Sequence, residues 1–104
     1  MERKKLKEIA HSRAGDKGKL TTISVIAYED ALYEAMKEAL TAERVEQHFK
    51  DIADGGVYRY ELPQLKALNF VIEGTKPEGV AASLDFDTHG KSLSWFMLEM
   101  EILV

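Results

Sequence analysis

The chain has 104 residues and a mass of 11.7 kDa, which is the size of one ordinary domain and excludes a two-domain enzyme. Hydrophobic residues make up 45% and charged residues 31% of the sequence, and this balance excludes disordered, fibrous and membrane-embedded proteins. The net charge of −4 and the pI of about 5.4 disfavour a nucleic-acid-binding domain, although residues 1–20 carry seven basic and only three acidic side chains.

The sequence contains no cysteine, which excludes disulfides, thiolate metal sites and cysteine nucleophiles. The charged start of the chain is not followed by an apolar segment of the kind that secretory signals contain. No apolar run is long enough to span a bilayer. We therefore expect a cytoplasmic protein without a membrane partner.

In chain order, a short apolar alternation at Leu6, Ile9 and Ala10 predicts a strand that leads into a polar loop, His11–Lys19. Residues 21–28 are rich in β-branched side chains and predict a central strand. From Glu29, apolar residues recur at helical spacing and predict an amphipathic helix.

A second helix is predicted to begin after Thr41, whose side chain is suited to cap its first turn. Alternating apolar residues then predict strands over Val57–Leu62 and Ala67–Glu73. The remaining chain predicts a short strand over Ser83–Asp87, a turn at His89–Gly90, a helix from Lys91 and a closing strand over Leu98–Val104.

The order strand, helix pair, strand, strand, helix, strand matches the split βαβ arrangement. The predicted fold is therefore α+β, a ferredoxin-like split βαβ sandwich with an extra N-terminal strand, forming one domain over residues 1–104. In such a sandwich one face of the sheet has no helices, and another subunit or a partner commonly covers a face of this kind. We therefore expect a homo-oligomer.

The polar loop combines an imidazole, a hydroxyl, a carboxylate, cations and glycines within nine residues. Glycines allow a turn whose successive N–H groups bind an anion, and Arg13 and Lys17 would add charge-assisted hydrogen bonds to a carboxylate or phosphate. In the alternative interpretation, Asp16 and Arg13 pair with each other or brace the backbone. Asn69, in an apolar strand, is expected to brace the loop or bind a ligand. The candidate anion site comprises His11, Ser12, Arg13, Gly15, Asp16, Lys17, Gly18 and Asn69.

Catalytic and metal sites are not predicted. His11, Ser12 and Asp16 are the residue types of a hydrolytic triad, but neighbours on a strand point to opposite faces, so His11 would not reach Ser12. His48 falls in a predicted helix and His89 in a predicted turn, and no two histidines share a metal-ligand spacing. We therefore predict no catalytic residue, no metal and no cofactor.

The segment Ile9–Gly18, which reads IAHSRAGDKG, resembles the opening motif of the AtuA-like C-terminal domain, found in proteins related to the acyclic terpene utilisation protein AtuA. Five later segments resemble the same domain in the same order, so that the resemblance covers nearly the whole chain. They are residues 23–27, 40–45, 59–63, 67–71 and 87–102.

This resemblance implies a ferredoxin-like fold and an association with the breakdown of acyclic isoprenoids through acyl-CoA intermediates. It also implies a separately encoded AtuA-like N-terminal protein as the partner of this chain. Our leading hypothesis is a non-catalytic accessory subunit that contributes the polar loop to an acyl-CoA or carboxylate site. The alternatives are a small self-contained oligomeric enzyme with His11 or Asp16 as acid or base, and a structural oligomerisation module.

Overall fold

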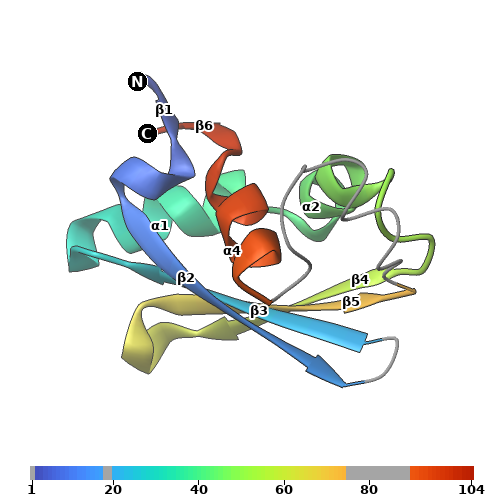
Figure 1. Cartoon of the computed structure of the whole chain (residues 1–104). Helices are drawn as coiled ribbons and strands as arrows, with labels where there is room; N and C mark the ends of the chain where they lie inside the picture. The colour runs from blue at the N-terminus through green and yellow to red at the C-terminus, as the bar shows by residue number, and fades with distance from the viewer. Residues whose placement is uncertain (1, 18–19, 75–89) are drawn as a thin grey trace.

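The computed structural model describes residues 2–17, 20–74 and 90–104, and three helices lie on one side of a four-stranded sheet (Figure 1). The elements in chain order are β1 (Arg3–Lys5), the 3-10 turn η1 (Leu6–Glu8), β2 (Ala10–Lys17), β3 (Leu20–Ala27), α1 (Asp30–Ala39), α2 (Ala42–Phe49), β4 (Val57–Leu62), η2 (Pro63–Leu65), β5 (Ala67–Glu73), α4 (Gly90–Leu98) and β6 (Glu101–Leu103).

The main sheet has the strand order β2-β3-β5-β4, and every neighbouring pair is antiparallel. β3 and β4 therefore run in the same direction with β5 between them, which is the split βαβ arrangement. The predicted ferredoxin-like α+β class is confirmed. The extra N-terminal strand, predicted around Leu6–Ala10, is instead β2, and Leu6–Glu8 form the turn η1. β6, shorter than the predicted closing strand, does not join this sheet but pairs with β1 in a separate two-stranded ribbon.

The helices form where the sequence predicts them. Thr41 is the N-cap of α2, and its side-chain oxygen accepts a hydrogen bond from the backbone N–H of Arg44 at 3.1 Å, as predicted. α1 buries Tyr33 and Met36 against the sheet. The predicted strand over residues 83–87 and the predicted turn residue His89 lie outside the described residues.

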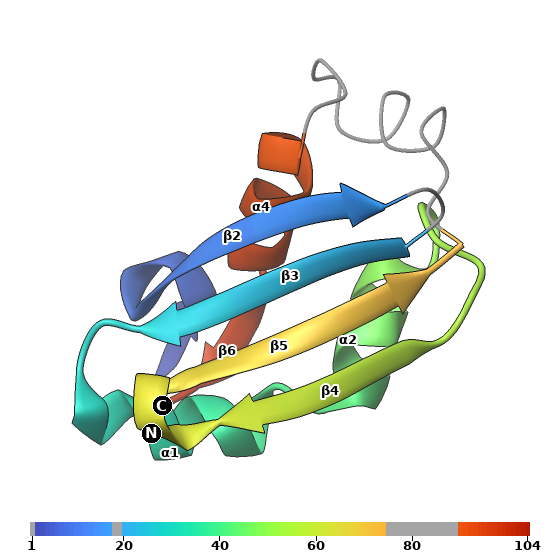
Figure 2. The same cartoon turned by 90° about the horizontal axis from the view of Figure 1, so that it is seen from below.

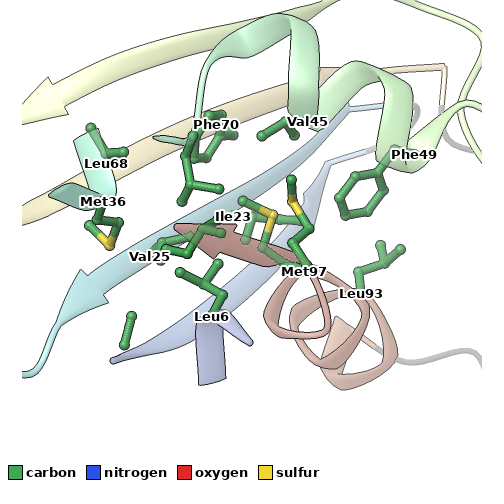
Figure 3. Packing of buried hydrophobic residues seen from close by; sticks show 14 of the residues in the cluster. Leu6, Ile23, Val25, Met36, Val45, Phe49, Leu68, Phe70, Leu93 and Met97 are labelled. Atoms are coloured by element: carbon green, nitrogen blue, oxygen red, sulfur yellow. The ribbon is translucent and has the colours of Figure 1, made fainter. Parts of the chain in front are cut away.

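The core lies between the helices and one face of the sheet (Figure 3). Ile23 and Val25 from β3 and Leu68 and Phe70 from β5 are fully buried, because alternate residues of a strand share one face. Helices α1, α2 and α4 contribute apolar residues from the opposite side, among them Met36, Val45, Phe49, Leu93 and Met97. This layer leaves the other face of the sheet outside the core.

The C-terminal end of α1 is fixed by an arginine from β4. Nη1 of Arg59 donates hydrogen bonds to the carbonyl oxygens of Lys37 at 2.6 Å and Leu40 at 2.9 Å. The last carbonyls of a helix have no partner within the helix, and a cation there also interacts favourably with the helix dipole. Nη2 of Arg59 in turn donates to Glu61 at 3.0 Å. Arg59 thus joins the edge strand to the helix layer.

The prediction that residues 11–19 form a polar loop is wrong for most of this segment. Residues 10–17 form β2, which pairs with the whole of β3, so residues 11–17 belong to a strand and not to a loop. Ala10 and Ala14 alternate on the core-facing side of β2 where large apolar residues would have signalled a strand. The cross-strand ladder therefore determines the conformation here against a weak local preference.

Candidate functional site

No described helix covers the face of the sheet that points away from α1, α2 and α4 (Figure 2). We call this surface the open face. It carries the alternate side chains of the four strands that do not enter the core. In the described part of the chain these are His11, Arg13, Gly15, Leu20, Thr22, Ser24, Ile26, Tyr58, Tyr60, Leu62, Ala67, Asn69, Val71 and Glu73.

The strand geometry of β2 divides the predicted anion site between two faces. His11, Arg13 and Gly15 lie on the open face, opposite Ile26, Ser24 and Thr22 of β3. Ser12 lies on the helix side, opposite Val25. The backbone of Asp16 and Lys17 belongs to β2, and Gly18 lies outside the described residues.

The predicted anion-binding turn is not formed by residues 11–17. Gly74 is the one described glycine with a positive φ, so Gly15 has an ordinary extended backbone. Successive N–H groups of a strand point alternately to its two sides and cannot converge on one anion. Any anion site on this segment is therefore made by side chains.

Two basic side chains of the motif lie near one another on the open face. The imidazole of His11 stacks on the ring of Tyr28, with centroids 5.5 Å apart and an angle of 21° between the planes. Arg13 is exposed and makes no hydrogen bond or ion pair with any described residue. Its guanidinium is thus a charged group of five donors available to a carboxylate or phosphate.

Asn69 lies in the middle of the open face rather than against a loop. Its Oδ1 accepts a hydrogen bond from the hydroxyl of Ser24 at 3.1 Å, and the prediction that it braces the polar loop is wrong. Ser24 also lies opposite Arg13 in the β2–β3 ladder, so a polar row of Arg13, Ser24 and Asn69 crosses three strands. Sequence reasoning missed Ser24 because its membership of the row depends on strand pairing.

The rejected triad remains unsupported among the described side chains. His11 and Ser12 lie on opposite faces of β2, as expected of neighbours on a strand. The Ser12 hydroxyl is buried and has no hydrogen-bond partner among the described residues. A hydrolytic nucleophile needs a base within hydrogen-bond reach, and no described side chain serves Ser12 in this way.

A hollow lies on the helix side of the sheet, between α2 and β6. It has a volume of about 520 Å³ and is lined in part by Arg44, His48 and Met100. Arg44 donates to the carbonyl oxygens of Ala39 at 3.2 Å and Glu101 at 2.7 Å, so its donors already bind the backbone. Arg3 also lines the hollow, but it lies 3.7 Å from the carboxylate of Glu101, and the negative charges of Glu99 and Glu101 in the lining disfavour a bound anion.

The contacts of His48 indicate a role in packing rather than in ligand binding. Its Nε2 lies 2.7 Å from the carbonyl oxygen of Phe96, and its ring stacks on the Phe96 ring at 4.2 Å. Burial lowers the pKa of His48 below the ordinary value for a histidine, and the positive charge of Arg44 acts in the same direction. Among the described residues, no three histidine or acidic side chains are grouped as metal ligands.

The fold and the site together define a ferredoxin-like α+β domain that has helices on one face of its sheet and a polar and aromatic opposite face. The family model of the AtuA ferredoxin-like domain matches residues 4–103. The chain belongs to this family, as its sequence motifs predict. No curated protein and no solved structure matches the chain significantly. Within the described residues, no helix has the length and apolar character needed to cross a membrane.

Proposed function

We propose that the chain is a non-catalytic accessory subunit that binds an acidic ligand on its open face. The observation that carries this proposal is the exposed guanidinium of Arg13, which has no partner among the described residues and lies on the same strand face as His11, on a surface that no described helix covers. A guanidinium binds carboxylates and phosphates through two parallel hydrogen bonds, and a neighbouring imidazole adds a further donor.

Family membership narrows the ligand class. Proteins related to AtuA are associated with breakdown of acyclic isoprenoids through acyl-CoA intermediates, so we take an acyl-CoA thioester or its carboxylate as the ligand. We take a separately encoded AtuA-like protein as the partner, since the family model that matches residues 4–103 is that of the AtuA ferredoxin-like domain. On this view the chain holds the acidic group, and the partner supplies the chemistry.

Calorimetric titration of the purified chain with acyl-CoA thioesters tests the proposal, with and without the AtuA-like protein. We expect Arg13→Ala to weaken binding at least about tenfold, because a charge-assisted hydrogen-bond pair is lost. Lys50→Ala, which removes an exposed cation at the end of α2, is the matched control for net charge. Equal affinities for the wild type and Arg13→Ala would refute the site.

Turnover measurements separate this proposal from the alternative of a self-contained acid–base enzyme. An enzyme of that kind would convert acyl-CoA substrates without a partner, and His11→Ala or Asp16→Asn would abolish the reaction. An accessory subunit would bind acyl-CoA but would not convert it in the absence of its partner. A purely structural module would show neither, and Arg13→Ala would then change stability alone.

A further inference from the structure

Three rows of side chains cross the open face, and their two ends differ in character. The strand register defines the rows as His11–Ile26–Ala67–Leu62, Arg13–Ser24–Asn69–Tyr60 and Gly15–Thr22–Val71–Tyr58. At the β2 end the rows terminate in His11, Arg13 and Gly15, which are an imidazole, a cation and a residue without a side chain. At the β4 end they terminate in large side chains with aromatic or apolar surface.

The large side chains at the β4 edge are unusually exposed for their type. Tyr58, Tyr60 and Leu62 expose 50%, 53% and 37% of their surface, respectively. Four strands spaced about 4.8 Å apart with about seven residues of 3.3 Å each give a projected area of roughly 440 Å². Side chains that stand out from the face enlarge the accessible area, which approaches the roughly 600 Å² per partner at the lower end of specific interfaces.

We propose that a second copy of this chain covers the open face, related by a two-fold axis that runs parallel to the strands. Two sheets packed face to face keep their strands within about 30° of one another. An axis along the strands places the β2 edge of each copy over the β4 edge of the other. Each row then lies over the same row of the second copy, running in the opposite direction. Arg13 therefore faces Tyr60 of the second copy, and Gly15 faces Tyr58 of the second copy.

Charge and shape favour this axis over its alternative. A two-fold axis across the strands and through the middle row would place Arg13 against Arg13 of the second copy, and like charges within an interface are strongly unfavourable. The axis along the strands places the Arg13 guanidinium over an aromatic ring, which attracts a cation. It also places the Tyr58 ring over Gly15, where the row has no side chain.

This arrangement rests on the proposed function and completes its site. Enclosed between two sheets, Arg13 and His11 would lie in a medium of lower dielectric constant than water, in which a carboxylate binds a guanidinium more strongly. The hydroxyl of Tyr60 from the second copy adds a donor over Arg13. The dimer has two equivalent sites, and one chain alone has no complete site.

Sedimentation of the purified wild type tests the association, since the monomer mass is 11.7 kDa and a dimer has twice that mass. We expect a dimer for the wild type and a folded monomer for Tyr60→Asp, whose new charge would be buried in the interface. Trp95→Asp is the matched control, because Trp95 is also exposed, at 63%, but lies on α4. A wild type that remains monomeric at high micromolar concentration overturns the inference.

Cross-linking tests the axis, and the absence of native cysteines makes engineered thiols unique. Arg13→Cys and Tyr60→Cys are prepared as separate proteins, mixed, and treated with a bismaleimide whose reach matches the spacing of about 10 Å between packed sheets. We expect the mixed pair to cross-link and each variant alone to cross-link poorly. Efficient cross-linking of Tyr60→Cys to itself would overturn the proposed axis.

The two proposals fail in different ways. A monomer that still binds acyl-CoA through Arg13 would overturn the dimer and leave the proposed function in place. A dimer with the expected cross-link and no affinity for acyl-CoA would overturn the proposed function and leave the dimer in place. Tyr60→Phe adds a direct measurement: it keeps the ring and removes the hydroxyl, so we expect a dimer with several-fold weaker ligand binding.

Discussion

Replacing Arg59 by alanine tests whether this arginine of β4 holds the end of α1. The substitution removes the donor of two hydrogen bonds, at 2.6 Å to the Lys37 carbonyl and 2.9 Å to the Leu40 carbonyl. Hydrogen bonds that involve a charged group contribute about 1.5–3 kcal/mol, and a cation at a helix C-terminus adds about 0.3–1 kcal/mol. We expect the free energy of unfolding to fall by about 2–4 kcal/mol.

Urea denaturation followed by circular dichroism measures this loss, and thermal unfolding should show a Tm lower by at least about 8 °C. Glu61→Gln is the control, because it removes only the ion pair of Arg59 with a half-exposed carboxylate. Exposed pairs of this kind contribute less than about 1 kcal/mol. If Arg59→Ala costs no more than Glu61→Gln, the carbonyl contacts do not stabilise the fold and our reasoning is wrong.

Three further predictions concern other positions. Burial lowers the pKa of His48, so as the pH falls below about 6.5 the unfolded chain binds a proton that the folded chain does not. The free energy of unfolding should therefore decline as the pH falls below about 6.5. His48→Gln should flatten that decline in urea titrations. Ser12→Ala should keep or raise the midpoint of urea unfolding, because the hydroxyl is buried and has no partner in the described part of the chain. Ser24→Ala should lower the free energy of unfolding by about 1 kcal/mol, because it removes the hydrogen bond to Asn69. Gly55→Ala should cost about 1–3 kcal/mol, since its Cβ would lie 2.6 Å from the backbone of β5, while Gly56→Ala, with its nearest contact at 3.4 Å, should change the Tm little.

The elements with clear periodicity could be predicted from the sequence. The bounds of β4 and β5 agree with the predicted strands, because apolar and polar residues alternate along both of them. The start of α2 agrees with the predicted cap at Thr41. In each case the local pattern and the tertiary structure favour the same conformation.

The candidate site was less predictable, because its geometry depends on pairing between distant segments. The composition of His11–Lys17 is typical of a loop, and β2 is a strand because β3 offers it a full ladder of partners. Ser24 and Tyr60 join the site through the β3–β5 and β5–β4 registers, which no local pattern contains. The role of Arg59 could have been suspected from the sequence, since Arg59 is a charged residue at a core-facing position of a predicted strand and needs a hydrogen-bond partner there.

The β1–β6 ribbon determines how the domain would respond to mechanical force. Glu2 and Val104 exchange both backbone hydrogen bonds, at 2.8 and 2.9 Å, so the two described ends of the chain meet at one end of the ribbon. A force that pulls these ends apart loads the hydrogen bonds one after another rather than all at once. The ribbon should therefore peel open at low force, and the four-stranded sheet, which contains neither of its strands, should yield in a separate, later event.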